Sequence, residues 1–319
     1  MTDAPRAKDV CIVSLGGNAL IRRGEKGTID EQFDHARSCM KQIARLAEEG
    51  WQVVITHGNG PIVGNIVLRN EAAKNTVPPM PLYICDADSE GGIGYMLQQT
   101  IYNHLRGIHY TGEVVTVITQ VVVDKNDEAF RNPAKPIGPF YSGEEAMTLK
   151  REKDWKYVED SGRGYRRVVP SPRPVKIIES GVIRKLCAFG VIVIAAGGGG
   201  VPVVELASGE LQGVDAVVDK DLSTSLLARD IGARRIVNLT QADMVYLHYG
   251  KPGQRGLRDV SLAEIKKYFS QGHFPPGSMG PKIEAVVEFL DAGGEEVIIT
   301  SPELMADAVN GRAGTSIHR

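Results

Sequence analysis

The stretch "VIVIAAGGGGVPVV", residues 191–204, places four consecutive glycines directly after a run of apolar, mostly β-branched residues. An apolar run without polar alternation is typical of a strand that is buried on both faces of a sheet. Consecutive glycines cost conformational entropy, so they are expected where the backbone must approach another group more closely than side chains would allow. The stretch therefore predicts a central strand followed by a loop with a close neighbour.

Further apolar runs, several of them ending in glycine, predict the other strands of the same sheet. They are residues 10–19, 51–61, 114–123, 234–240 and 295–301. Apolar residues with helical spacing separate them, at residues 31–49, 91–106, 176–188, 221–231, 261–269 and 281–292. Alternating strands and helices predict an α/β fold, with a parallel sheet covered by helices on both sides. Ligands of such folds bind at the carboxyl ends of the strands, which is where the glycine clusters lie.

Residues 124–175 interrupt this alternation. They are rich in proline, glycine and charged residues, as in "DKNDEAFRNPAKPIGPFYSGEEA" and "EDSGRGYRRVVPSPRPV". About fifty residues of this composition inside a compact domain predict a protruding excursion or lid. We refer to residues 124–175 as the excursion.

The composition excludes several classes of function. The 319 residues carry 37 Lys and Arg against 39 Asp and Glu, without a long basic tract, so nucleic acid is not an expected partner. The four cysteines are widely spaced, which predicts neither a zinc site nor disulfides but buried thiols in a reducing compartment. The start of the chain is polar, and no segment approaches about 18 uninterrupted apolar residues. We therefore expect a cytoplasmic protein without a membrane partner.

Three glycine loops follow predicted strands: "SLGGNA" (14–19), "THGNGPIVGN" (56–65) and "AAGGGGVPVV" (195–204). The first two run directly into helical patterns, so their N–H groups and helix dipoles favour an anionic ligand. The second also contains G-x-G-x-x-x-G, which is similar to a dinucleotide-binding fingerprint. That interpretation is disfavoured because this loop follows the second strand and because the other two loops would have no role. The chain contains no G-x-x-x-x-G-K-[ST] motif either.

Three lysines are flanked by proline, glycine or aspartate: Lys135 in "NPAKPIGPF", Lys220 in "VVDKDLST" and Lys282 in "GPKIEA". A lysine ammonium is a mobile point charge that suits phosphate oxygens. Asp219 and Asp221 flank Lys220, and two interpretations of them remain open. They either form a poised electrostatic or metal-linked group, or they cap a helix and start its first turn.

Taken together, these motifs resemble those of carbamate kinases in the amino acid kinase superfamily, over nearly the whole chain. The strings that carry the resemblance are "LGGNA", "HGNGPIVGN", "NPAKPIGPF", "VVPSPRP", "GGGGVPVV", "VDKD", "HYGKP" and "HFPPGSMGPKIEA". The resemblance implies a three-layer αβα sandwich around a mainly parallel sheet of about eight strands, with the excursion as a protruding subdomain. It also implies a homodimer.

The reaction implied is ATP + carbamate ⇌ ADP + carbamoyl phosphate with Mg²⁺, in the cytoplasm, during arginine or agmatine breakdown. Residues 1–190 would form the lobe for carbamate or carbamoyl phosphate, including the excursion as a lid, and residues 191–319 the lobe for ATP or ADP. The sequence does not fix the direction of the reaction.

The resemblance also implies residue roles. The catalytic group would be Lys135, Lys220, Lys282 and Asp221. Substrate would be bound by Gly16, Gly17, Asn18, Gly58, Asn59, Gly60 and Arg163. The nucleotide would be bound by Gly198, Gly199, Asp219, Met279 and Pro281, together with Lys220 and Lys282. Metal would arrive on the nucleotide phosphates, without an assigned protein ligand, and His57 would shape its loop because an anionic carbamate needs no general base.

Two features of the sequence leave alternatives open. Asp86, Asp88 and Glu90 replace apolar or amide residues of the family, and they either weaken substrate binding or face solvent. Arg131 stands where lysine is common.

The rival functions are another phosphotransferase of the superfamily, acting on an amino-acid carboxylate or a nucleoside monophosphate, and a ligand sensor without turnover. The excursion argues against the first rival, and the three lysines argue against the second.

Overall fold

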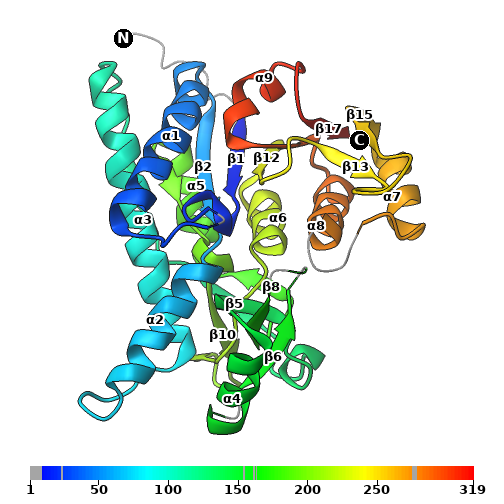
Figure 1. Ribbon diagram of the computed structural model, residues 1–319. Coiled ribbons are helices and arrows are strands. Elements are labelled where there is room, and N and C mark those ends of the chain that lie inside the picture. The colour runs from blue at the N-terminus through cyan, green and yellow to red at the C-terminus, as the bar shows by residue number, and fades with distance from the viewer. Residues whose placement is uncertain (1–8, 23, 154, 161, 163, 275–278) are drawn as a thin grey trace.

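The main sheet lies in the upper part of the molecule in the view of Figure 1. The computed structural model describes residues 9–22, 24–153, 155–160, 162, 164–274 and 279–319. Among these residues eight strands form the main sheet, in the spatial order β15 (Asp259–Ser261), β17 (Thr315–His318), β16 (Glu296–Thr300), β12 (Arg235–Leu239), β1 (Val10–Leu15), β2 (Gln52–His57), β9 (Ile192–Ile194) and β3 (Val114–Thr116). All neighbouring pairs are parallel except β16 and β17. The predicted, mainly parallel sheet is therefore confirmed.

Helices cover both faces of this sheet. Successive side chains of a strand point to opposite faces, and on β1 Cys11 and Val13 enter one core while Ile12 enters the other. One helical layer consists of α1 (Ile29–Glu48), α3 (Leu82–Gly107) and α9 (Met305–Val309). The opposite layer consists of α5 (Ser180–Ala188), α6 (Lys220–Ile231), α7 (Leu262–Ser270) and α8 (Met279–Asp291). The three-layer αβα sandwich is thus confirmed (Figure 1).

Local sequence signals fix where the helices begin and end. At α1, Thr28 Oγ1 accepts from the Glu31 N–H at 3.3 Å and the Thr28 N–H donates to Glu31 Oε2 at 2.8 Å, forming a capping box. The left-handed backbone of Gly50, with φ +81°, follows its end. All four cysteines are buried and unpaired, as predicted. No helix in the described part of the chain is long and apolar enough to cross a membrane.

A second sheet lies beside the main one and corrects one prediction. It contains β11 (Leu211–Gly213), β10 (Val201–Glu205), β4 (Gln120–Val123) and β8 (Pro174–Ile177). The single strand predicted at 114–123 is wrong, because β3 joins the main sheet and β4 joins the second. The chain turns between the two sheets at Thr119, whose Oγ1 donates to Val117 O and accepts from the Ala196 N–H.

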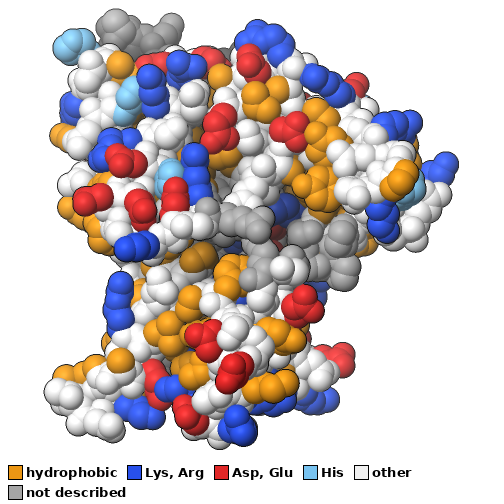
Figure 2. Space-filling view, in the orientation of Figure 1, with side chains coloured by type: hydrophobic (Ala, Val, Ile, Leu, Met, Phe, Trp, Pro, Cys, Tyr) orange, Lys and Arg blue, Asp and Glu red, His pale blue; other side chains and the backbone are white. Residues whose placement is uncertain are grey.

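The excursion begins where β4 ends and returns at β8. It folds into an antiparallel sheet in the order β5 (Lys135–Tyr141), β7 (Tyr165–Val169) and β6 (Lys156–Glu159), with α4 (Gly143–Lys153) beside it. It protrudes from the main body, and the space-filling view narrows between the two parts (Figure 2). Its base packs on α2 (Gly60–Ala73), where a Cβ added to Gly64 would lie 2.0 Å from Gly138 Cα. Glycine is required at this contact.

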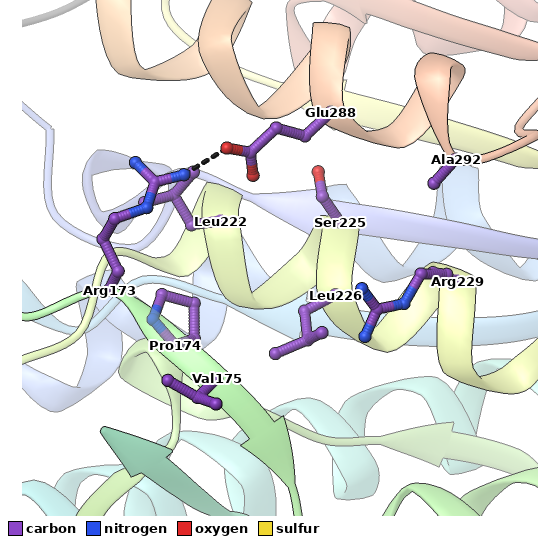
Figure 3. Close-up of a pocket in the computed structure, with 9 residues that line it drawn as sticks. All are labelled: Arg173, Pro174, Val175, Leu222, Ser225, Leu226, Arg229, Glu288 and Ala292. Carbon is purple, nitrogen blue, oxygen red and sulfur yellow. Dashed lines mark hydrogen bonds and ion pairs between the residues drawn. The ribbon is translucent and has the colours of Figure 1, made fainter. Parts of the chain in front are cut away.

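Arg173 fixes the end of the excursion to α8. Its guanidinium donates to Glu284 Oε1 at 2.6 Å and also to Glu288. Figure 3 shows Arg173 and Glu288 at the rim of a small pocket between β8, α6 and α8, with Leu222, Ser225 and Leu226 on the α6 side. The excursion is therefore tied to the helix that carries Lys282.

The remaining elements are short. They are the hairpin of β13 (Val245–Leu247) and β14 (Arg255–Leu257) and the 3-10 turns η1 (Gly17–Ala19), η2 (Glu128–Phe130), η3 (Gly197–Gly199) and η4 (Pro302–Leu304). The first glycine loop was expected to lead directly into a helix, which is wrong, because only η1 follows it and α1 starts at Ile29. The helix predicted at 91–106 begins nine residues earlier, at Leu82, and the start of the predicted segment 176–188 belongs to β8.

Candidate active site

Three loops meet at the carboxyl ends of the adjacent strands β1, β2 and β9. The Gly58 N–H donates to Leu15 O at 2.9 Å. A Cβ added to Gly58 would lie 2.8 Å from Gly17 N and 3.2 Å from Lys220 Cδ. The loops thus form one cluster with Lys220, because neighbouring parallel strands end at the same edge of the sheet.

The four consecutive glycines are required by contacts within the protein. Three of them have left-handed backbones, with φ of +70° at Gly198, +104° at Gly199 and +86° at Gly200. An added Cβ would lie 2.2 to 2.5 Å from His57 Nε2 at Gly197, Asn59 Nδ2 at Gly198, Val218 O at Gly199 and Val121 Cγ2 at Gly200. Side chains are therefore excluded by protein neighbours, and the approach of phosphate to Gly198 and Gly199 stays a prediction.

Lys220 and Lys282 share one carboxylate. Lys220 Nζ donates to Asp221 Oδ1 at 2.7 Å, and Lys282 Nζ donates to Asp221 Oδ2 at 2.7 Å. Both lysines stand in the first turn of a helix, α6 or α8, where the positive end of the helix dipole adds to their charge. The structure thus brings together three of the four residues that were predicted to be catalytic.

The fourth, Lys135, reaches the same region from the excursion. Its Nζ donates to Asp219 Oδ2 at 2.5 Å. The other oxygen of Asp219 accepts from the N–H groups of Asp221 at 2.9 Å and Leu222 at 3.4 Å, so Asp219 is the N-cap of α6. Asp219 thus confirms the prediction of a helix cap. Its second oxygen also forms an ion pair with Lys135.

Burial and neighbouring charges shift the pKa of both partners of the buried pair. Burial is the main cause that lowers the pKa of Lys220 from its ordinary 10.5 to about 8, although Asp221 opposes the shift. Burial alone would raise the pKa of Asp221, but Lys220 and Lys282 hold it far below its ordinary value. Asp221 is therefore an anion at neutral pH, whereas Lys220 loses its proton near pH 8.

Sequence reasoning missed two polar residues that support this pair. Ser14 Oγ accepts from Lys220 Nζ at 2.7 Å, and Asn238 Nδ2 donates to Asp221 Oδ1 at 2.9 Å. Both lie near the carboxyl ends of strands β1 and β12, within otherwise apolar runs. A single polar residue inside a buried strand was the signal available, because buried polar groups need partners.

Solvent exposure, one of the two interpretations of the acidic residues of α3, holds for Asp88 but is wrong for Asp86 and Glu90, and weakened substrate binding stays a prediction. Asp88 is exposed, whereas Asp86 and Glu90 are fully buried behind the glycine loops. Glu90 accepts from the Gly197 N–H at 2.8 Å and the Thr119 N–H at 3.1 Å. Burial raises the pKa of both Asp86 and Glu90 well above the ordinary values. Glu90 therefore acts as a clamp on the four-glycine loop and does not face solvent.

His57 stays uncharged at neutral pH. Burial lowers its pKa from 6.5 to about 4, and the charge of Lys220 contributes in the same direction. Its Nε2 is enclosed without a hydrogen-bond partner and lies against Gly197. A role in shaping the loop is consistent with this position.

The other predicted site residues lie around the same cluster. The Gly16 N–H donates to Leu239 O at 2.9 Å, and Gly60 begins α2 beneath Pro136 O. Met279 and Pro281 lie in the first turn of α8 beside Lys282. Arg163 and the side chain of Asn18 lie outside the described part of the molecule. Within that part, no three His, Cys, Asp or Glu side chains form a group that could hold a metal ion.

Comparisons with known proteins agree with this geometry. The family model described as "Amino acid kinase family" matches residues 9–301. Because this match covers most of the chain, the chain belongs to the amino acid kinase family. Its parallel sheet lies in an αβα sandwich, with glycine loops and lysines at the carboxyl ends of the strands.

Individual relatives are more specific. The chain is 49% identical over 308 residues to a carbamate kinase of Pyrococcus furiosus, which covers 96% of this chain and 98% of that protein. A structure of carbamate kinase from Giardia lamblia bound to citric acid matches with a TM-score of 0.94 and 42% identity, over 98% of this chain and 99% of that one. The same enzyme bound to AMP-PNP matches with a TM-score of 0.89 and 43% identity, with the same coverage of both chains.

Proposed function

We propose that this protein is an ATP:carbamate phosphotransferase, which catalyses ATP + carbamate ⇌ ADP + carbamoyl phosphate. The observation that carries the proposal is the pair of ammonium groups on the buried Asp221, at the junction of three glycine loops, in a chain 49% identical to a carbamate kinase. Phosphoryl transfer needs alignment and charge neutralisation more than covalent help. This site supplies both.

The two lysines would flank the phosphoryl group as it moves. Lys220 and Lys282 are held on opposite oxygens of Asp221, so their separation is fixed before substrate arrives. Preorganised charges stabilise a transition state without reorganising during the reaction. Carbamate is already an anion, so no general base is required, and the neutral His57 is left with its structural role.

The acceptor would lie against the first two loops. Backbone N–H groups of Gly16, Gly17 and Asn18 would surround the phosphoryl group, and Gly58, Asn59 and Gly60 would hold carbamate. Both loops adjoin Lys220: Ser14 of the first loop accepts from its Nζ at 2.7 Å, and a Cβ added to Gly58 of the second would lie 3.2 Å from its Cδ. Residues 1–190 form the acceptor lobe in this proposal.

The excursion would close this half of the site. Lys135 already reaches Asp219 at the start of α6, and Arg163 belongs to the same segment. Excluding water from a phosphoryl-transfer site strengthens its electrostatic interactions and suppresses hydrolysis.

The nucleotide would bind to residues 191–319. Its phosphates would approach Gly198, Gly199, Asp219 and the start of α8 at Met279 and Pro281. The AMP-PNP complex of the Giardia enzyme supports a nucleotide site in this fold. Helix N-termini are suited to phosphate groups, and α6 and α8 present two of them together with Lys220 and Lys282.

Magnesium would arrive on the nucleotide. Every oxygen of Asp219 and Asp221 already accepts at least one hydrogen bond from a lysine, from Asn238 or from the start of α6. Mg²⁺ commonly binds phosphate oxygens and water, with few protein ligands. The side chains present therefore fit a Mg²⁺ ion that is held by the nucleotide phosphates. The ion would neutralise part of the phosphate charge.

We further propose that the protein is a homodimer through α3 and β3. Strand β3 is the edge of the main sheet, and Tyr95, Tyr102 and Ile118 beside it have 44 to 59% of their surface exposed. These side chains line a shallow depression with Thr116 of the edge strand. A second copy of the same face would cover both the edge and the aromatic side chains. Light scattering of Tyr95→Glu should show monomers, whereas the exposed Tyr249→Glu should remain dimeric; a dimeric Tyr95→Glu would contradict the proposal.

Cytoplasmic localisation and a role in arginine or agmatine breakdown stay predictions. The reaction as written runs in both directions, and its physiological direction depends on metabolite concentrations. Cell fractionation and growth on arginine or agmatine with the gene deleted test both statements.

The defining experiment is ATP formation from ADP, Mg²⁺ and carbamoyl phosphate. We expect turnover by the wild type and its loss in Lys220→Ala. The matched control is Lys41→Ala, which removes an exposed lysine of α1. Absence of ATP formation by the wild type, with ADP still bound, would contradict the proposed function.

A further inference from the structure

The side-chain amide of Asn59 is held in one orientation by α3. Its Nδ2 donates one hydrogen bond to Asp86 Oδ1 and another to Ser89 Oγ at 2.7 Å. An amide nitrogen carries only two protons, so both are used on the α3 side. The carbonyl oxygen Oδ1, on the other branch of the same amide, points away from these two acceptors.

This carbonyl oxygen is available to a ligand. No described residue donates a hydrogen bond to Asn59 Oδ1. Unlike the second oxygen of Asp86, this atom is not completely enclosed by the protein. A water-sized molecule can therefore touch it. Its neighbours along the chain mark the location: Gly58 lies against Gly17 and Lys220, and Gly60 faces Pro136 O.

A carbonyl oxygen and an amide nitrogen select opposite ligand atoms. The oxygen accepts from N–H groups, whereas the nitrogen would donate to an oxyanion. Carbamate and carbamoyl phosphate each carry an –NH₂ group that distinguishes them from simple carboxylates and acyl phosphates. The orientation of Asn59 would therefore decide whether the amino group of the substrate is recognised.

We propose that Asp86 is a positioning residue that, with Ser89, holds Asn59 so that its Oδ1 accepts a hydrogen bond from the amino group of the phosphoryl acceptor. The inference rests on the proposed function and names the group that sets its specificity. Asp86 is completely buried, and its second oxygen has no partner. In such a dry site each unmade hydrogen bond is costly, so the orientation is strongly determined.

The test compares two phosphoryl donors of nearly equal shape, carbamoyl phosphate and acetyl phosphate, in which –NH₂ is replaced by –CH₃. The measured quantity is the ratio of their kcat/KM values for ATP formation from ADP. We expect the wild type to prefer carbamoyl phosphate and the ratio to fall about five- to tenfold in Asp86→Val, the effect of one hydrogen bond. Asp86→Asn retains an acceptor for Asn59 and should keep the ratio. Asp88→Asn, an exposed change on the same helix, is the matched control.

Ser89→Ala provides a milder second variant, which keeps Asp86 and should lower the ratio about two- to threefold. It decides the question if Asp86→Val does not fold. A folded variant that retains the wild-type ratio, or loses activity equally with both donors, would overturn the inference. Failure of the wild type to use carbamoyl phosphate at all would instead contradict the proposed function.

Discussion

Lys220 and Lys282 belong to different helices, yet each donates at 2.7 Å to a different oxygen of the Asp221 carboxylate. One buried anion thus sets the distance between two cations that would otherwise repel each other. The strands and helices supply the framework, but this carboxylate fixes where the two charges stand.

Asp221→Asn should abolish most of the activity. An amide offers one acceptor oxygen and an NH₂ group that repels lysine, so one ammonium loses its partner. We expect kcat to fall about 100- to 1000-fold and the free energy of unfolding to fall by about 3 kcal/mol. Asp291→Asn, which breaks the exposed pair with Lys266, should change stability by about 0.5 kcal/mol or less. Wild-type kcat in Asp221→Asn would exclude the proposed role.

The rate should depend on the charge of Lys220. Because its pKa is lowered to about 8, kcat/KM should fall as the pH rises above about 8, when the ammonium loses its proton. Arginine stays charged throughout this range, so Lys220→Arg should have lower activity but no such fall up to pH 10. Steady-state profiles from pH 6 to 10 measure this, and an identical basic limb in the two proteins would assign it to another group.

Gly198→Ala should lower the free energy of unfolding by more than the left-handed backbone of this residue alone explains. The new Cβ would lie 2.2 Å from Asn59 Nδ2, at a φ of +70°. Gly209→Ala is the matched control, because its φ is +85° and no atom lies within 4 Å of the added Cβ. We expect a loss of about 1 kcal/mol at Gly209 and about 3 kcal/mol at Gly198. Chemical denaturation measures both free energies of unfolding. Equal losses in the two variants would show that Asn59 moves aside without a cost in stability.

Asp86→Asn should change how stability depends on pH. Burial raises the pKa of Asp86 above its ordinary 3.8, so the folded protein keeps a proton that the unfolded chain has already lost. The contribution of this carboxyl to stability therefore declines as the pH rises from about 4 through the raised value. Asparagine has no proton to lose. The variant should gain stability relative to the wild type as the pH rises above about 4, and a difference in melting temperature that is constant with pH would contradict this.

The fold was largely predictable because buried parallel strands leave a strong signal. The apolar runs at β1, β2, β9, β12 and β16 were identified, since both faces of these strands are covered. The start of α3 was not identified, because Asp86, Asp88 and Glu90 interrupt its apolar stripe. The break between β3 and β4 lies at Thr119, which is hydrogen-bonded to Val117, Ala196 and Glu90, and no periodicity reveals these contacts.

The site was predicted in its charged members and missed in its polar ones. Lys220, Lys282 and Asp221 were found because motifs surround them, whereas Ser14 and Asn238 are single polar residues in apolar runs. The role proposed for Asp86 depends on which amide it contacts. That contact joins residues 27 positions apart and has no local signature.

Asp219 gives one oxygen to the start of α6 and the other to Lys135 of the excursion. With this ion pair formed, three ammonium groups face two carboxylates, and the site carries one net positive charge. Any movement of the excursion that withdraws Lys135 leaves two ammonium groups and two carboxylates, so the net charge of the site is zero. An anionic product is then no longer attracted by a net positive charge. The same displacement that opens a path for the product would therefore also weaken the electrostatic attraction that retains it.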